Sequence, residues 1–191
     1  MDVRVQEAGF FGNAKQKAIL SKSRKFQNPS ITANGQKRAE VMLTDLRTLW
    51  FNTGSLCNIA CVNCYMGSSP VNNDLVYLSL NDVRRYLDEV EHEGYGLEEV
   101  GFTGGEPLVR KDLAKLVRMV SQVSGIEDIS LSTNAVLLAE QGPELRDAGV
   151  SRVNISLDSL QAERVDAISR RSGSFERIMK GLEVAEEMQF S

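Results

Sequence analysis

Residues 97–134 read LEEVGFTGGEPLVRKDLAKLVRMVSQVSGIEDISLSTN, and this stretch decides the fold. Residues 97–103 are rich in β-forming types and end at two glycines, which is typical of a buried strand leading into a turn. Leucine and valine recur at helical spacing through residues 111–123. Apolar and polar residues then alternate over 126–134, as they do in a strand. A strand, a helix and a strand in this order predict two parallel strands joined by a right-handed crossover.

The same pattern extends in both directions along the chain. We expect further strands and helices over the ranges 46–54, 79–93, 136–148, 152–158 and 174–188. The fold class predicted is therefore α/β, with about four βα units over residues 41–191. A closed (β/α) barrel needs roughly 200 residues or more, so we expect a partial barrel whose C-terminal part is missing from this core domain.

The first 40 residues differ in charge from the rest. They hold eight lysines and arginines against three acidic residues, a net charge of +5, whereas the whole chain is at −4 and residues 41–191 are therefore at −9. A basic segment without clear periodicity is typical of a flexible extension, and less often of a partner-binding arm. The acidic body argues against nucleic-acid binding.

Neither a membrane span nor a secretory signal is expected. No apolar run approaches the roughly 18 residues that a span needs. Charged residues interrupt the first positions, Asp2, Arg4 and Glu7, so that no apolar signal region forms there. Cytoplasm is the simplest compartment.

All three cysteines fall within eight residues, Cys57-x3-Cys61-x2-Cys64, on a predicted loop after the first strand. This clustering argues against a disulfide framework. Three thiolates on one loop can bind an inorganic cluster and leave one position open. A structural zinc site needs a fourth ligand, and the only histidine, His92, lies on a predicted helix. Three incidental cysteines remain the alternative.

The cysteine spacing, followed by Gly104-Gly105-Glu106-Pro107, resembles the radical S-adenosylmethionine (radical SAM) superfamily. Without the cysteines, the Gly-Gly-Glu-Pro sequence would be an ordinary turn between a strand and a helix. The resemblance implies a [4Fe-4S] cluster on the three cysteines and SAM on its open iron. It also implies that Gly104, Gly105 and Glu106 support the methionine end of SAM. Reductive cleavage of SAM would then give a 5′-deoxyadenosyl radical that abstracts hydrogen from a substrate.

Within that superfamily, the segments TGGEPLVRKDL, ISLSTNAVLLAE and LRDAGVSRVNISLDSL are similar to the GTP 3′,8-cyclase family of molybdenum cofactor biosynthesis. By this resemblance, Gly105 and Ser156 touch SAM, and Ser132 lies near a substrate nucleotide. A side chain at position 105 is then expected to block SAM while leaving the cluster largely intact.

Three further residues are weaker candidates for cofactor contacts. Asn134 and Asp158 end predicted strands, where barrel enzymes place ligand contacts, although both also suit turns and caps. Tyr65 follows the last cysteine and would shield the cluster, stack on adenine or simply pack. The family commonly has an aromatic residue where this chain has Asn63. We expect Arg110, like Lys111, to be solvated.

The substrate site departs from the cyclase family. That family has basic residues at the places occupied here by Glu99, Gly101 and Leu56, so we expect GTP to bind poorly. The predicted function is a radical SAM enzyme with an unassigned small-molecule or peptide substrate and an electron donor such as flavodoxin or ferredoxin. The alternatives are a GTP 3′,8-cyclase, a non-catalytic iron–sulfur protein and a zinc-stabilised interaction module.

Removal of residues 1–40 should leave cluster binding intact, because this segment has no pattern of apolar residues strong enough to fill a core. Iron and acid-labile sulfide per chain, measured after anaerobic reconstitution, should match the full chain. A truncated chain that fails to fold would contradict this.

Overall fold

The computed structural model describes residues 28–75 and 78–191 of a chain that divides into two units, Met1–Leu43 and Thr44–Ser191. In the first unit, residues 28–43 contain a turn closed by an isolated antiparallel bridge between Ile31 and Lys37. The flexible extension predicted over residues 1–40 lies largely outside the described residues.

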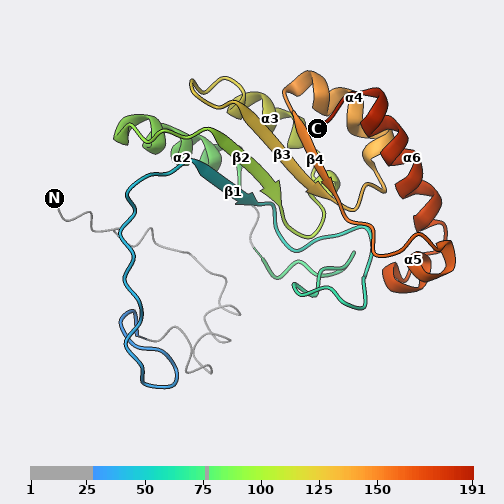
Figure 1. Cartoon of the computed structure of the whole chain (residues 1–191), viewed down its shortest axis with the longest axis horizontal. Coiled ribbons are helices and arrows are strands. Elements are labelled where there is room, and N and C mark those ends of the chain that lie inside the picture. Colours follow the sequence, from blue (N-terminus) through green and yellow to red (C-terminus); the bar gives the residue numbers. More distant parts are fainter. Residues whose placement is uncertain (1–27, 76–77) are drawn as a thin grey trace. The chain divides into compact units, whose positions relative to one another are not determined.

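The second unit contains a four-stranded parallel sheet with the strands in chain order (Figure 1). Its strands are β1 (Thr48–Asn52), β2 (Glu99–Thr103), β3 (Asp128–Thr133) and β4 (Arg152–Ile155). Each is shorter than predicted, but all four occur where the alternation placed them. The predicted α/β partial barrel is therefore confirmed.

The helices are α2 (Leu80–Glu93), η1 (Pro107–Val109), α3 (Leu113–Val120), α4 (Leu138–Ala148), α5 (Ala162–Ser169) and α6 (Ser174–Glu187). The predicted start of α2 is confirmed, because Ser79 and Asp82 form a reciprocal capping box. Gly149 ends α4 in the left-handed conformation. None of the described helices is long and apolar enough to cross a membrane.

Two local differences from the prediction have physical causes. The helix expected over 111–123 begins at Leu113, because Pro107 starts a separate 3-10 turn and Arg110 then adopts an extended backbone. Helix α5 was not predicted. It has only eight residues, no side-chain cap at its start and two buried positions, Val165 and Ser169, so its apolar stripe is too short to recognise.

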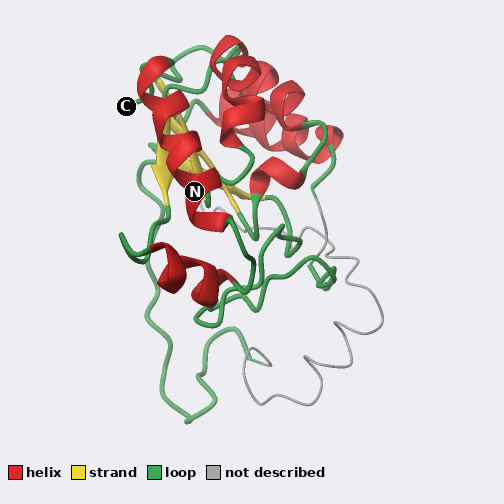
Figure 2. Ribbon diagram, turned by 90° about the vertical axis from the view of Figure 1, so that its right-hand side faces the viewer, coloured by secondary structure: helices red, strands yellow, loops and turns green. Residues whose placement is uncertain are grey.

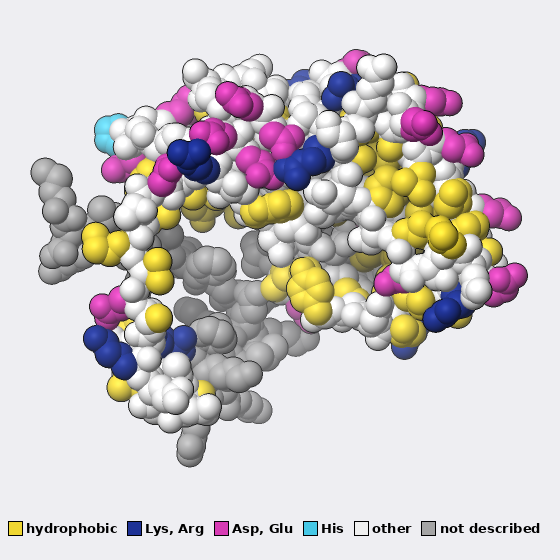
Figure 3. All heavy atoms as spheres, in the orientation of Figure 1, with side chains coloured by type: hydrophobic (Ala, Val, Ile, Leu, Met, Phe, Trp, Pro, Cys, Tyr) yellow, Lys and Arg dark blue, Asp and Glu magenta, His cyan; other side chains and the backbone are white. Residues whose placement is uncertain are grey.

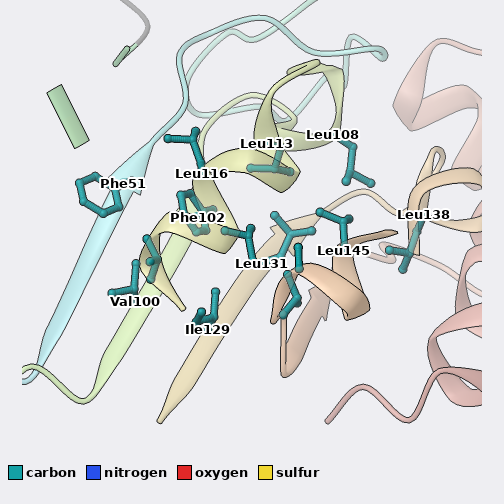
Figure 4. Close-up of a cluster of buried hydrophobic side chains, with 14 of the residues drawn as sticks. Phe51, Val100, Phe102, Leu108, Leu113, Leu116, Ile129, Leu131, Leu138 and Leu145 are labelled. Carbon is teal, nitrogen blue, oxygen red and sulfur yellow. The ribbon is translucent and has the colours of Figure 1, made fainter. Parts of the chain in front are cut away.

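One face of the sheet forms the core with the helices (Figure 4). Alternate strand residues, such as Phe102 and Leu131, are fully buried there. Helices α2, α3 and α4 supply the other half, including Leu87, Leu116 and Leu145. Figure 2 shows the strands lying beside this helical layer.

The opposite sheet face, called the open face below, is polar and partly exposed. Because side chains alternate along a strand, it is made of the residues between those of the core. These residues are Thr48, Trp50, Asn52, Glu99, Gly101, Thr103, Asp128, Ser130, Ser132, Arg152 and Asn154.

At the carboxyl edge of the sheet, the loops after β1 and β2 touch through their backbones. The N–H of Gly105 donates to Gly54 O at 2.9 Å, and the N–H of Glu106 donates to Leu56 O at 2.9 Å. A Cβ on residue 105 would stand 2.2 Å from the carbonyl oxygen of Leu56. Only glycine therefore allows the two loops to approach this closely.

Gly105→Ala should lower the free energy of unfolding by roughly 1–3 kcal/mol, because the added methyl forces the two loops apart. Urea denaturation of the purified chain measures this difference. Gly96→Ala is the matched control, since a Cβ there would meet only Asp45 Oδ1, at 3.9 Å. Equal losses in the two variants would show that the contact between the loops is not tight.

Candidate functional site

The three cysteines lie on the loop that leaves β1 at the carboxyl edge of the sheet. All three are free thiols; Cys57 is buried, whereas Cys61 and Cys64 are half-buried. The loop folds back on itself, because Cys57 N donates to Ser69 O at 3.2 Å and Cys64 N donates to Cys61 O at 3.3 Å. The cysteine spacing thus corresponds to a compact turn with all three side chains on one segment.

The end of α5 holds this loop in place. Ala60 N donates to Ser169 O at 3.1 Å, and Val62 N donates to Ile168 O at 2.9 Å. These acceptors are among the last carbonyls of the helix, which have no partner within it. Just beyond the helix, Arg171 Nη1 donates to Asn58 O at 3.0 Å. Three hydrogen bonds therefore fix the segment that joins Cys57 to Cys64.

The environments of the three thiols differ. Burial raises the pKa of Cys57 to about 11. Burial also raises the pKa of Cys61, and the nearby Asp158 adds to the effect. At Cys64, burial acts in the same direction, but the surrounding N–H groups outweigh it and the pKa is lowered. One of these groups, Ser68 N, lies 3.3 Å from Cys64 Sγ.

Gly105 lies against the cysteine loop itself. A Cβ there would strike the Leu56 carbonyl that directly precedes Cys57. The expectation that a side chain at position 105 leaves the cluster intact stays a prediction, and this contact counts against it. Gly104 adopts φ 143°, and a Cβ on it would lie 2.7 Å from Thr53 Oγ1. Both glycines are required by contact between loops in this structure.

Glu106 is almost fully buried, and its carboxylate is held by three donors from the protein. Oε1 accepts from Leu108 N at 3.0 Å and from Thr133 Oγ1 at 2.7 Å, and Oε2 accepts from Asn134 N at 2.7 Å. Burial raises the pKa of Glu106, and the same hydrogen bonds oppose that shift. Glu106 therefore connects the turn after β2 with the end of β3.

Asn134 connects the end of β3 to the cysteine loop. Its Nδ2 donates to Asn58 Oδ1 at 2.8 Å and lies 3.6 Å from Cys57 Sγ. Its Oδ1 accepts from Val136 N at 3.0 Å, so the side chain also stabilises the turn before α4. The predicted turn role is thus confirmed, whereas the predicted cofactor contact of Asn134 stays a prediction.

The other predicted residues lie around the same edge. Ser132 is half-buried on the open face, and Ser156, just beyond β4, is exposed. The exposed Asp158 accepts from Asn63 Nδ2 at 3.3 Å, which brings the β4 loop to the third cysteine. Tyr65 is 91% exposed and therefore does not pack against the loop.

Sequence reasoning missed Asn58 and Arg171, and it was wrong about Arg110. The Arg110 side chain is only 8% exposed. Its Nε and Nη2 donate to the two oxygens of Asp112 at 2.7 and 3.1 Å, while Nη1 is buried without a partner. The sequence did contain a signal for this ion pair, since Arg110 is followed two residues later by Asp112. No sequence signal pointed to Asn58 or Arg171, because their contact spans 113 positions.

The donor set fits an iron–sulfur cluster that has one open iron, because three free thiols share one short loop and each thiolate can bind a separate iron. In residues 28–75 and 78–191, no three His, Cys, Asp or Glu side chains, the cysteines included, are arranged around a single metal ion. A four-iron cluster differs from such a site because each thiolate binds its own iron. The assignment of the three cysteines as cluster ligands stays a prediction.

Comparison with curated proteins identifies relatives that share most of this chain. GTP 3′,8-cyclase of Listeria monocytogenes serotype 4b is 40% identical over 134 residues, which is 69% of this chain and 39% of the relative. The enzyme of the same name from Staphylococcus carnosus is 33% identical over 151 residues, 76% of this chain and 44% of the relative. The chain thus spans about two fifths of the length of these relatives.

Solved structures share the fold at low sequence identity. Native anSMEcpe with bound AdoMet and Cp18Cys peptide has a TM-score of 0.61 and 19% identity, covering 77% of this chain and 41% of that one. BtrN in complex with AdoMet and 2-DOIA has a TM-score of 0.51 and 17% identity, covering 71% and 56%.

The model of the Radical SAM superfamily matches residues 51–191, a range that includes the cysteine loop, the Gly-Gly-Glu-Pro turn and β2 to β4. With this match and the relatives above, the chain belongs to the radical SAM superfamily.

Proposed function

We propose that this chain supplies the cluster and SAM site of a radical SAM enzyme acting on a small-molecule or peptide substrate. The observation that supports this most directly is the joining of the cysteine loop to the Gly-Gly-Glu-Pro turn, through Gly105 N to Gly54 O and Glu106 N to Leu56 O. Both superfamily motifs thereby occupy one edge of the sheet.

Cys57, Cys61 and Cys64 would hold a [4Fe-4S] cluster, and the residues at the same sheet edge would surround SAM. Bound together, the two cofactors supply the electron and the 5′-deoxyadenosyl group for hydrogen abstraction. Asn134 orients the loop beside Cys57, and Asn63 connects Asp158 to it. The protein residues thus hold the site in place.

SAM contacts are proposed for the polar groups that the strand ends present. Ser156 is exposed beyond β4, and its N–H donates to Thr133 O at 3.0 Å, so its backbone is fixed while its hydroxyl is accessible. Ser132 lies on the neighbouring strand β3 and belongs to the open face, where we expect the substrate. Tyr65 is free to cover a ligand, since its ring is exposed.

A second candidate function is GTP 3′,8-cyclisation, favoured by the names of the curated relatives. The charge of the open face counts against it, because its strand residues include two carboxylates and one guanidinium. The electron would come from a donor such as flavodoxin or ferredoxin, and cytoplasm remains the expected compartment.

Anaerobic reconstitution followed by reduction in the presence of SAM tests the proposal. Release of 5′-deoxyadenosine and methionine is the expected result. An intact cluster without SAM cleavage would instead favour a non-catalytic iron–sulfur protein. Bound zinc without acid-labile sulfide would favour an interaction module.

Cys61→Ala should abolish SAM cleavage, because each thiolate binds a separate iron and the chain has no fourth cysteine to replace it. Iron and sulfide should fall below the level of the parent chain. Val62→Ala is the control, since this neighbouring side chain is 58% exposed. An intact, SAM-responsive cluster in Cys61→Ala would refute the assignment.

Arg171→Ala should loosen the cysteine loop, because the carbonyl of Asn58 loses its donor. Hydrogen exchange of the loop amides in the cluster-free chain should become about tenfold faster, equivalent to about 1.4 kcal/mol for one hydrogen bond. Arg164→Ala, an exposed arginine on α5, should leave the exchange unchanged. Identical exchange in both variants would mean that Arg171 does not hold the loop.

A further inference from the structure

Trp50 is an aromatic residue on an otherwise polar surface. It is the only tryptophan in the chain, it is 46% exposed, and it opposes Gly101 across β1 and β2. Its neighbours on the same strand and face are Thr48 and Asn52, which are also exposed. The indole is therefore not part of the apolar core, which lies on the other side of the sheet.

The ring lies with its face on the backbone of Gly101. A Cβ at that position would stand 2.4, 2.5 and 2.6 Å from Cε3, Cζ3 and Cδ2 of Trp50. Three adjacent ring atoms are nearly equidistant only if the point lies over the ring rather than beside its edge. Glycine at 101 thus allows the indole to lie flat, and the ring retains exposed surface.

The charged side chains of the open face form a closed network at the amino ends of β2, β3 and β4. Arg152 Nη2 contacts both Glu99 Oε1 and Asp128 Oδ2, and its Nε donates to Asp128 Oδ2 at 2.9 Å. Asp128 is the main cause of the raised pKa of Arg152, and Glu99 adds to it. Thr48 Oγ1 also donates to Glu99 Oε2 at 3.3 Å. Figure 3 shows acidic and basic side chains side by side on the surface of the molecule.

This network determines which charges the open face offers to a ligand. Among its eleven strand residues, two are carboxylates and one is a guanidinium, giving a net charge of −1. Arg152 is already engaged by both carboxylates, so it is not available to a phosphate. Arg152 partly neutralises Glu99, but the open face still carries net negative charge and offers no free cation among its strand residues, which is unfavourable for a polyphosphate.

We propose that Trp50 is a specificity residue on which a planar ring of the substrate stacks, and that this substrate is neutral or cationic rather than a polyphosphate. The proposal rests on the proposed function, because it places the substrate on the open face. An indole face attracts both planar rings and cations. The net charge of −1 on the open face favours the same compounds.

The single tryptophan makes its own fluorescence the measurement. The full chain is titrated with guanosine, cationic N7-methylguanosine and GTP, which share a purine ring and differ in charge. Both nucleosides should quench the emission to saturation. GTP should require at least about tenfold higher concentration at low ionic strength, and added salt should narrow the gap because it screens the repulsion.

Two variants separate the stacking surface from general folding. Trp50→Leu should weaken guanosine binding by about tenfold or more in calorimetry, since stacking on an aromatic ring supplies much of the affinity for a base. Gly101→Ala should do the same while keeping the tryptophan, because the new methyl displaces the ring. Tyr86→Ala is the control; this aromatic side chain is 40% exposed and packs near Phe51, on the covered face.

Three results would overturn the proposal: no saturable quenching by either nucleoside, GTP binding as tightly as guanosine, or unchanged guanosine affinity in folded Trp50→Leu and Gly101→Ala. Circular dichroism establishes that the variants are folded. The proposed function is tested separately, by measuring SAM cleavage in the absence of substrate. Failure of that assay in the parent chain refutes radical SAM chemistry, whereas normal cleavage with no stacking on Trp50 refutes only the substrate class.

Discussion

The buried carboxylate of Glu106 is the interaction on which the edge of the sheet depends. Burying a carboxylate is costly unless donors replace its water, and here Leu108, Thr133 and Asn134 supply all of them. These donors come from the turn after β2 and from the end of β3, so one side chain fixes both. Asn134 can then reach the cysteine loop, where its Nδ2 lies 3.6 Å from Cys57 Sγ. The position of Cys57 therefore depends on Glu106 through Asn134.

The sequence alone predicts the strands and helices that follow from the periodicity of apolar residues. Four strands and their major helices were predictable because apolar residues recur at the spacing that each element buries. The cysteine loop and the Gly-Gly-Glu-Pro turn could be predicted to form one site, because few kinds of protein combine these two motifs. Contacts between segments far apart in the sequence, or set by local packing, could not be predicted. The burial of Arg110 depends on packing around its turn, and the closeness of Gly105 to Leu56 depends on how two loops meet. Neither leaves a periodic signal in the sequence.

The two faces of the sheet have separate tasks. Residues such as Phe102 and Leu131 pack against the helices, while the alternate positions on the strands carry polar and charged side chains. A single-residue shift in strand register would exchange these faces, so the apolar packing also determines which side chains face a ligand. This explains why Ser132 lies on the open face, whereas its neighbour Thr133 turns inward to Glu106.

The hydrogen bonds between the cysteine loop and the end of α5 also affect how the protein folds. Ala60 pairs with Ser169, and Val62 with Ile168, across more than one hundred positions. Contacts of such sequence separation form late, because a long loop must close before they can stabilise the chain. Until then, three thiols lie on an unsecured segment, where disulfide formation and oxidation to sulfenic acid compete with correct assembly. Expression under reducing, low-oxygen conditions should therefore improve the yield of protein with intact cysteines.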